Sequence, residues 1–560
     1  MEGTYSIVDM AGEMPIGIQD FKEIRDYDSL YIDKSDMISQ ILSKRIKVYL
    51  YTRPRRFGKS LNLSMLDAFF NLKYPKDNKW FDGLKVSECE ECQKHKNEYP
   101  VINFDFKELS AISMDAFKLD IVSTMSDLYR QHKYLLDSEI LVDFDKQYIT
   151  DVIGKRLNYL ELRKSMSVLS HMLHEHHGKK VIFLFDEYDN PINRSYGKPF
   201  QQDVVDFMRD LLSSALKGNN SLEFGVVTGV MQIAKESIFS GLNNLRVNNI
   251  FSNNFDESFG FTDAEVRSIL EDNNHPEKYD EVKEWYDGYR FGDADVYNPW
   301  SVLIYVDEGF KPGPYWTSTS SNDILDTLMD KADKSVFDDL LSLSQGEGIE
   351  KELNPTVALG DLEHDPNAIY SLLVMSGYLS AVKQGKGYDL FIPNGEMYDV
   401  FGDVVGRYIN RKCGNSRYSL LISNISYAIL NNRPESIEKH LYNLIAEVIG
   451  SNMLTHERVY QAFLIGLLMN VRGGYTVTAE MENGKGRYDI MLRSASSKNP
   501  NIVIELKRSD FESSLQHDAE KALSQIMERD YIHGLSGETI LYGISFKGKQ
   551  PFIVSKIVTA

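Results

Sequence analysis

Four stretches in the first half of the chain are apolar at nearly every position and are separated by segments with helical spacing. The apolar stretches are Lys47–Tyr51, Tyr99–Phe106, Val181–Phe185 and Leu222–Val230, and the helical segments are Leu61–Leu72, Met114–Leu136, Arg156–His177 and Gln202–Leu216. A strand without a polar face is buried on both sides, and strands that alternate with helices join into a parallel sheet covered by helices. The sequence therefore predicts that residues 1–255 fold as an α/β domain around a parallel sheet.

The rest of the chain is organised differently, and its 560 residues are too many for one ordinary core. Residues 256–450 contain a stretch rich in aromatic residues, glycine and aspartate, Trp285–Leu303, which is followed by helical patterns, so a mostly helical middle region is expected. After residue 451 the order is helix, three strands, helix and strand, with Thr539–Phe546 as the last long strand. This order predicts a small α/β domain, and three parts overall: 1–255, 256–450 and 451–560.

Composition narrows the class of protein. With 42% hydrophobic and 26% charged residues the chain is neither disordered nor fibrous. No apolar run approaches the roughly 20 residues that span a membrane, and the N-terminus lacks a signal-peptide pattern. Three cysteines cannot form a disulfide framework. We therefore expect a cytoplasmic protein without a membrane partner.

Charge is unevenly distributed along the chain. The formal net charge is −20, yet residues 451–560 carry 13 Lys+Arg and 12 Asp+Glu, so the first 450 residues carry −21. A polyanion such as a nucleic acid would meet the least repulsion at the C-terminal part.

A phosphate-binding loop is predicted where Gly58, Lys59 and Ser60 follow a strand and open a helix. Such a loop offers backbone N–H groups and the positive end of a helix to an anion. Lys59 would reach the β- and γ-phosphates of a nucleotide, and the Ser60 hydroxyl would bind Mg²⁺.

This loop departs from the general pattern G-x-x-x-x-G-K-[ST], because Arg53 stands where the first glycine is expected. Pro54 stiffens the loop, and Arg55 and Arg56 add to its positive charge. The predicted nucleotide-binding residues of this segment are Arg53, Pro54, Arg55, Arg56, Phe57, Gly58, Lys59, Ser60 and Leu61.

Two carboxylates follow the apolar run Val181–Phe185, and ligands of open parallel sheets bind at that end of the strands. Asp186 would hold Mg²⁺ through water, and Glu187 would polarise an attacking water molecule. Thr228 ends another strand, where its hydroxyl would sense the γ-phosphate or form only a local hydrogen bond.

A second group of carboxylates lies near the C-terminus. Glu505 and Lys507 share one face of a strand because side chains alternate, and the neighbouring strand can present Asp489 beside them. Two carboxylates on one divalent cation form an oxygen-rich Mg²⁺ site. Asp489 and Glu505 are the predicted metal ligands, and Lys507 would orient a water molecule or neutralise developing charge.

Several long motifs together resemble the bacterial AAA-ATPase-like family of P-loop NTPases, which commonly carries a C-terminal PD-(D/E)XK nuclease domain. The resemblance covers most of residues 14–305 and resumes near residue 457. The motifs are IRDYDSLYIDKSDMI, TRPRRFGKSLNLSML, LFDEYDNPI, TGVMQIAKESIFSGLNN, FGFTDAEV and WYDGYRFGDADVYNPWSVL. The C-terminal segment GRYDIMLRSASSKNPNIVIELKRS is similar to the D…(D/E)-x-K signature of the nuclease superfamily.

The resemblance implies a P-loop sheet that uses ATP and Mg²⁺, followed by an α/β/α domain of the restriction-endonuclease type that uses Mg²⁺ or Mn²⁺. It implies that Asp489, Glu505 and Lys507 are catalytic and that Glu457 and Gln525 support them, with Glu482 a weaker candidate. Gln232 departs from the arginine that the family pattern leads us to expect, which would slow hydrolysis.

Two other patterns are more ambiguous. Cys89 and Cys92, followed by His95, resemble half of a zinc site, but no second half is visible, so an ordinary surface turn is favoured. The aromatic stretch Trp285–Trp300 could stack on bases, but packing of a lid against the ATPase core is favoured.

The leading hypothesis is an ATP-binding and ATP-hydrolysing protein coupled to a metal-dependent nuclease, with DNA favoured as the nucleic acid. The alternative is a nucleotide-dependent switch whose C-terminal domain binds nucleic acid without cutting. A small-molecule kinase is disfavoured, since it leaves the C-terminal carboxylates without a role. Both leading hypotheses are compatible with a homo-oligomer.

Overall fold

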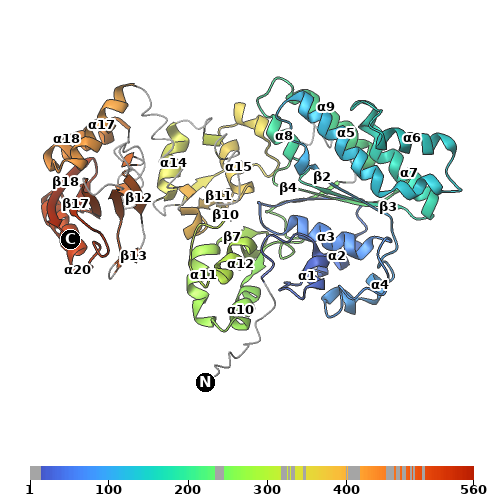
Figure 1. Cartoon of the computed structure of the whole chain (residues 1–560), viewed down its shortest axis with the longest axis horizontal. Helices are drawn as coiled ribbons and strands as arrows, with labels where there is room; N and C mark the ends of the chain where they lie inside the picture. Colours follow the sequence, from blue (N-terminus) through green and yellow to red (C-terminus); the bar gives the residue numbers. More distant parts are fainter. Residues whose placement is uncertain are drawn as a thin grey trace. The chain divides into compact units, whose positions relative to one another are not determined.

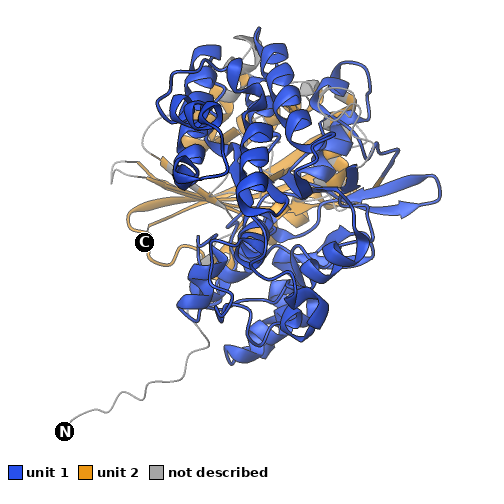
Figure 2. Ribbon diagram, turned by 90° about the vertical axis from the view of Figure 1, so that its right-hand side faces the viewer, with its two compact units in different colours: residues 1–324, 350–396 blue, residues 325–349, 397–560 orange. Residues whose placement is uncertain are grey.

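The structure is a computed structural model. It describes residues 14–233, 245–316, 325, 328–329, 334–344, 348–398, 400–401, 416–448, 460–461, 464, 467–468, 475–479, 482–483, 486–494 and 499–559. The chain forms two compact units (Figure 2), and each is described by itself: residues 1–324 with 350–396, and residues 325–349 with 397–560.

The first unit is built on a five-stranded sheet in the order β2-β3-β4-β1-β5. All adjacent strands are parallel, as the sequence predicts. Strand β4 separates β1, which leads into the phosphate loop, from β3, which ends in Asp186. The strands are β1 (Val48–Thr52), β2 (Val101–Asp105), β3 (Val181–Asp186), β4 (Leu222–Gly229) and β5 (Leu245–Asn248). The edge strand β5 was not predicted.

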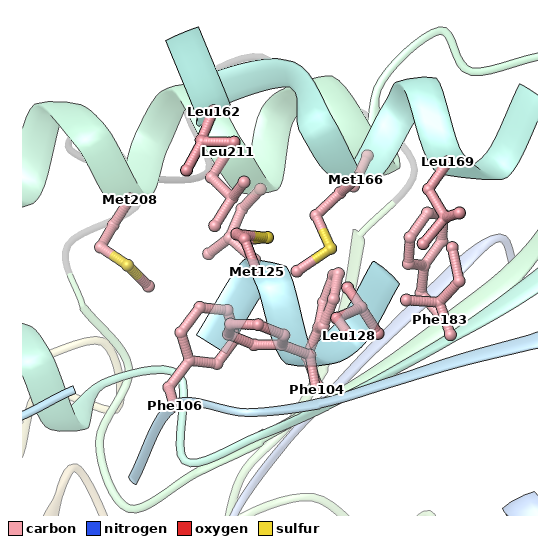
Figure 3. Packing of buried hydrophobic residues seen from close by; sticks show 14 of the residues in the cluster. Phe104, Phe106, Met125, Leu128, Leu162, Met166, Leu169, Phe183, Met208 and Leu211 are labelled. Carbon is pink, nitrogen blue, oxygen red and sulfur yellow. The ribbon is translucent and has the colours of Figure 1, made fainter. Parts of the chain in front are cut away.

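Helices cover both faces of this sheet (Figure 1). One face buries Phe104, Phe106 and Phe183 against methionine and leucine side chains of α5, α7 and α9 (Figure 3). Helix α3 packs on strands β2, β3 and β4. Helix α6 was not predicted, and the segment Met114–Leu136 divides into α5 and a 3-10 turn, η3. The helices and turns are α1 (Phe21–Asp26), α2 (Asp36–Lys44), α3 (Lys59–Phe70), η1 (Lys85–Glu88), α4 (Glu90–Gln93), η2 (Phe106–Glu108), α5 (Met114–Gln131), η3 (Lys133–Asp137), α6 (Asp143–Ile153), η4 (Glu161–Lys164), α7 (Ser165–His177), α8 (Asn190–Ser195) and α9 (Gln201–Leu216).

The segment that follows the sheet, residues 255–316, is called the lid below. It combines three helices with a three-stranded sheet in the order β6-β8-β7 around a core of aromatic and aliphatic side chains. Its elements are β6 (Phe261–Thr262), α10 (Asp263–Asp272), η5 (Pro276–Lys278), α11 (Tyr279–Tyr286), β7 (Tyr289–Phe291), β8 (Ala294–Tyr297) and α12 (Pro299–Asp307).

A second small sheet, in the order β10-β11-β9, also lies in the region that the sequence predicts to be mostly helical. Its strands, like those of the lid, are five residues or shorter, which is too short to give a clear alternating pattern. The elements of this part are β9 (Ile349–Lys351), η7 (Leu359–Glu363), α15 (Ala368–Met375), β10 (Ser380–Gln384) and β11 (Gly387–Phe391).

The second unit contains a five-stranded mixed sheet in the order β12-β15-β16-β17-β18. Only β16 and β17 pair in parallel. The expectation that Thr539–Phe546 is the last long strand is wrong, because β18 follows it after a tight turn at Gly548. The elements are β12 (Tyr475–Ala479), β13 (Glu482–Asn483), β14 (Gly486–Arg487), β15 (Ile490–Ser494), β16 (Asn501–Arg508), η8 (Glu512–Ser514), α20 (Leu515–Glu528), β17 (Glu538–Lys547) and β18 (Gln550–Thr559).

Helices expected in the middle region share a core with this C-terminal sheet. Side chains of α17 (Ser416–Leu430) and α18 (Pro434–Val448) pack on the face of the sheet opposite α20. The Tyr542 hydroxyl donates to the Ile429 carbonyl at 2.7 Å. These helices therefore belong to the C-terminal unit. Helix α14 (Lys334–Ser344) belongs to the same unit. The three-part division of the chain stays a prediction.

Within the described ranges, no helix is both long enough and apolar enough to cross a membrane.

Candidate active sites

The phosphate loop joins strand β1 to helix α3. Its last residue, Gly58, has a φ of +83° and caps the helix that begins at Lys59. A side chain at this φ would be strained, and the space beside Gly58 is open. The loop therefore leaves room for a ligand in front of the N-terminus of a twelve-residue helix.

Lys59 is buried inside this loop. Its ammonium group donates to the carbonyl oxygens of Arg53 and Pro54 at 3.1 and 2.8 Å. Burial lowers the pKa of Lys59, and the negative charges of Glu187 and Asp186 oppose that shift. Lys59 is thus a desolvated cation at the centre of the loop.

Asp186 brings together three predicted site residues from three parts of the chain. The Ser60 hydroxyl donates to one carboxylate oxygen of Asp186 at 2.5 Å, and the Thr228 hydroxyl donates to the other. A hydroxyl beside a carboxylate, next to a phosphate-binding loop, is the donor set that Mg²⁺ uses in P-loop proteins. These residues therefore fit a magnesium–nucleotide complex.

Arg53 corrects the sequence prediction, because its side chain is not directed at a phosphate. The guanidinium group is fully buried and donates to the carbonyl oxygens of Thr52 and Asn248 at 2.9 and 2.8 Å. It also lies 5.0 Å from the ring centres of Phe259 and Phe291. Burial lowers the pKa of Arg53 to about 10. Arg53 is therefore a structural residue that joins β1, β5 and the lid.

The lid packs directly on the phosphate loop. Phe57 contacts Tyr289 and Phe291 with ring centres 5.0 and 5.1 Å apart. The guanidinium of Arg56 lies 4.1 Å from the ring centre of Trp300. These contacts confirm the interpretation of the aromatic stretch as a lid surface.

The backbone of the same loop is also held. The Trp316 indole donates to the Arg55 carbonyl at 3.2 Å. A side chain at Gly377 would come within 2.7 Å of Pro54, so only glycine fits there. Leu61, in the first turn of α3, is half-buried.

Glu187 has a φ of +49°, in the left-handed region, and its backbone N–H donates to Asp186 at 3.0 Å. Strained backbone of this kind is concentrated at functional sites. The position of Glu187 immediately after Asp186 agrees with a role at the carboxyl edge of the sheet.

The sequence interpretation missed a buried clamp formed by the next two residues. Asp189 accepts the backbone N–H groups of Val230 and Met231 at 3.1 and 2.9 Å. The Tyr188 hydroxyl donates to the Met231 carbonyl and accepts from the Ile233 N–H, both at 3.0 Å. The motif DEYD thus fixes the backbone on either side of Gln232. This link between the ends of β3 and β4 forms only because the two strands are neighbours in the sheet.

Asp105 was also missed. It ends strand β2 and pairs in register with Asp186 of β3. Desolvation raises the pKa of Asp105 to about 6, and the negative charges of Asp186 and Glu187 add to the shift. The sequence signal was a third acidic residue at the end of a predicted strand.

At the C-terminal site, Asp489 precedes β15 and lies opposite Glu505 in the register that pairs Ile490 with Ile504. The Leu506 backbone N–H donates to the Asp489 carboxylate at 2.6 Å. The two predicted metal ligands therefore lie side by side on adjacent strands.

Glu505 is 2% exposed and accepts from Lys507 at 3.2 Å and from the Gln525 side chain. Gln525, on α20, also donates to the buried Tyr531 hydroxyl at 3.2 Å. Four of the predicted residues are thus brought together: Asp489, Glu505, Lys507 and Gln525. Their donor set, two carboxylates beside a lysine, fits a divalent cation.

These contacts do not test the other two residues predicted for this site, Glu457 and Glu482. Glu457 lies outside the described residues. Glu482 lies on strand β13, where it pairs with Arg487 of the neighbouring strand β14. In the described part of the chain, no cluster of three or more His, Cys, Asp or Glu residues has a geometry that could hold a metal ion. A metal at either site would therefore also need oxygen atoms of water or substrate.

Cys89 and Cys92 form a disulfide at the start of the short helix α4, a bond that the sequence interpretation did not include. Both sulfur atoms are used in this bond, so the pair is not half of a zinc site.

Comparisons with known proteins agree with this division of sites. Residues 15–239 match a family model described as a predicted AAA-ATPase, and residues 455–556 match one described as the PD-(D/E)XK nuclease superfamily. The chain therefore carries a nucleotide-binding P-loop domain and a nuclease-like domain, and the predicted resemblance is confirmed.

An uncharacterized protein in the vnfD 5′ region of Azotobacter chroococcum mcd 1 is 29% identical over 320 residues, or 57% of this chain. The match spans 56% of that relative's length. Among solved structures, the ORC2 protein of Aeropyrum pernix in its ADPNP–ADP complexes is 10% identical, with a TM-score of 0.27 over 68% of this chain and 92% of that one. The fold described above rests on the strand order and the family matches, not on that likeness.

Proposed function

We propose that the chain hydrolyses ATP at the phosphate loop and cleaves DNA at the C-terminal carboxylates. The observation that carries the proposal is the convergence of Asp489, Glu505, Lys507 and Gln525 where β15 begins, beside β16 and helix α20. A solvated surface would not bury Glu505 between a lysine and a glutamine.

At the phosphate loop, the ammonium of Lys59 would leave the loop carbonyls and contact the phosphates. Ser60 and Asp186 would hold Mg²⁺, which neutralises phosphate charge when bound. Glu187 would accept a proton from the attacking water, and Thr228 would orient Asp186 through the hydrogen bond between them.

At the C-terminal site, Asp489 and Glu505 would hold Mg²⁺ or Mn²⁺, which lowers the pKa of a bound water and stabilises charge on the phosphodiester. Lys507 would orient the water or neutralise the developing charge. Gln525 would keep Glu505 in place, since it donates to Glu505 while contacting Tyr531.

The test is cleavage of supercoiled and linear DNA with Mg²⁺ or Mn²⁺, with and without ATP. Lys507→Ala should abolish cutting. Lys521→Ala removes an exposed lysine from helix α20 and should cut like the parent. Cutting by Lys507→Ala at the parent rate would overturn the nuclease proposal.

A second candidate is a nucleotide-dependent switch that binds nucleic acid without cutting. The observation that favours it is Gln232, whose amide oxygen is buried and has no hydrogen-bond partner among the residues described. A cation at this position could contact phosphate, whereas glutamine cannot supply that charge. An ATP-dependent change in oligomeric mass, with no cleavage under either metal ion, would favour the switch.

A further inference from the structure

Arg56 is a cation of the phosphate loop whose guanidinium has no hydrogen-bond partner among the residues that the structure describes. Its side chain is half-buried, and its guanidinium lies 4.1 Å from the ring centre of Trp300. Over the described parts of the chain, its guanidinium forms no ion pair and no hydrogen bond. Arg53, three residues earlier, is bonded to backbone carbonyls instead.

Two features hold Arg56 in this place. Its backbone has a φ of +69°, a left-handed conformation that a residue with a long side chain rarely adopts. The Trp300 ring beneath it is fixed, because the Trp300 backbone N–H bonds to the Asn298 side chain at 3.0 Å and its indole donates to the Tyr315 carbonyl at 3.3 Å. The lid thus supplies a rigid platform for a cation of the loop.

Arg56 lies three residues before Lys59 in the loop between β1 and α3, which places it at the carboxyl edge of the sheet. Burial lowers the pKa of Arg56, with the charge of Arg55 adding to the shift, and Glu187 opposes it. Glu187 acts in the same way on Lys59. Arg56 and Lys59 are therefore two cations of one loop, and the charge of Glu187 acts on both.

Phosphoryl transfer spreads negative charge over the oxygens of the γ-phosphoryl group, and an arginine that contacts them accelerates the reaction. The planar guanidinium offers several parallel donors to such oxygens. A half-buried guanidinium that stacks on an aromatic ring, with no partner for its donors in the described ranges, is suited to this contact.

We propose that Arg56 is a catalytic residue that contacts the γ-phosphoryl oxygens of ATP from within the same chain, with Trp300 as its positioning residue. The inference rests on the proposed ATP hydrolysis. A bond forms between the water oxygen and the γ-phosphorus, and the bond from that phosphorus to the bridging oxygen of ADP breaks. The water proton passes to Glu187, and Arg56 keeps its charge throughout.

The test uses the full chain and measures binding of ADP, with and without aluminium fluoride, by calorimetry, together with the kcat for ATP hydrolysis. Aluminium fluoride mimics the transferred phosphoryl group. In the parent it should tighten ADP binding by about tenfold or more, and Arg56→Gln should abolish that gain while changing the Kd for ADP alone less than about threefold. Arg56→Gln should lower kcat by about 10³-fold, the lower end of the range known for arginine fingers.

Three variants serve as controls. Arg209→Gln removes a helix-surface arginine paired with Asp206, and should behave as the parent. Arg56→Lys keeps the charge and should recover part of the aluminium fluoride effect. Trp300→Phe should keep most of kcat, whereas Trp300→Ala should lose it with little change in the Kd for ADP, because only the aromatic platform is removed.

Two results would overturn the inference and can be told apart. If Arg56→Gln retains both the aluminium fluoride effect and kcat, Arg56 is not catalytic and the proposed ATPase stands. If the parent binds no ADP and hydrolyses no ATP, and Lys59→Ala is no different, the proposed ATPase function fails and the inference fails with it.

Discussion

The phosphate loop and the C-terminal carboxylate site hold their charged groups in different ways. At the phosphate loop, Lys59 donates to loop carbonyls, while Ser60 and Thr228 donate to Asp186. These groups satisfy one another, so a nucleotide must displace bonds that already exist. At the C-terminal site, the buried carboxylate of Glu505 accepts hydrogen bonds from the side chains of Lys507 and Gln525.

The two sites also differ in how far apart their residues lie along the chain. The phosphate site joins residues 53–60 to Asp186 and Thr228, so it exists only when β1, β4 and β3 have paired. The C-terminal site lies within residues 489–525 on two strands and one helix. Substitutions at the first site should therefore affect stability as well as chemistry, and those at the second mainly chemistry.

The largest expected effect belongs to Glu505→Gln, which keeps the shape of the side chain and removes its charge. Loss of one carboxylate ligand should reduce DNA cleavage by about 10³-fold, because the metal that activates water is no longer held. Glu512→Gln removes an exposed carboxylate nearby and is the matched control. Equal cleavage by Glu505→Gln and Glu512→Gln would show that the carboxylate pair is not the catalytic site.

Asp186→Asn should lower the kcat for ATP hydrolysis by about 10²- to 10³-fold, since Mg²⁺ loses an anionic partner. It should also shift the thermal unfolding midpoint, because Asp186 links Ser60 and Thr228 across the sheet. Asp203→Asn, on the exposed face of helix α9, should change neither quantity. Parent-like hydrolysis by Asp186→Asn would remove the distinction drawn between the two sites.

Much of this arrangement could be predicted from the sequence, for identifiable reasons. Strands β1, β3 and β4 are buried at nearly every position. Asp186 ends β3, and Thr228 is the last residue but one of β4. The C-terminal pair Asp489 and Glu505 could be predicted because side chains alternate along a strand.

Other features depend on contacts that are distant in the sequence. Strand β5 is four residues long and contains Arg246 and Asn248, so it has no apolar pattern of its own and forms by pairing with β1. The role of Arg53 depends on carbonyls of β5 and the lid. Both arginines contact aromatic rings of the lid, but Arg53 is fully buried and bonded to carbonyls, whereas Arg56 is half-buried.

Gly229→Ala tests whether the clamp beside the phosphate site couples it to stability. A side chain at this position would come within 2.6 Å of an Asp189 carboxylate oxygen and 2.7 Å of the Tyr188 ring. Overpacking of this kind should reduce the free energy of unfolding by about 1–3 kcal/mol, measured by denaturant titration. Gly360→Ala, where a side chain meets open space, is the control. An unchanged stability in Gly229→Ala would mean that the clamp does not constrain the site.

The smallest expected effect is that of Asp105→Asn on the pH dependence of stability. The pKa of Asp105 is raised from 3.8 to about 6, so its protonated form is favoured by folding. Its contribution to stability is complete below about pH 3.8 and is lost as the pH rises through about 6.

Asp105→Asn should therefore remove the loss of stability that the parent shows as the pH rises. Relative to the parent, the variant should gain a few tenths of a kcal/mol at pH 8, a value reduced by solvent screening, and nothing at pH 4. Thermal unfolding of both proteins between pH 4 and pH 8 measures the difference. A gain of the same size at pH 4 would show that ionisation of Asp105 is not its cause.

The most direct test of two separate chemistries in one chain is to measure ATP hydrolysis and DNA cleavage in parallel on the parent, Lys59→Ala and Lys507→Ala. The account predicts that Lys507→Ala loses cleavage and keeps ATP hydrolysis, whereas Lys59→Ala loses ATP hydrolysis. The effect of Lys59→Ala on cleavage then measures how far ATP controls the nuclease. Cleavage by Lys507→Ala at the parent rate, or ATP hydrolysis by Lys59→Ala at the parent rate, would contradict the account.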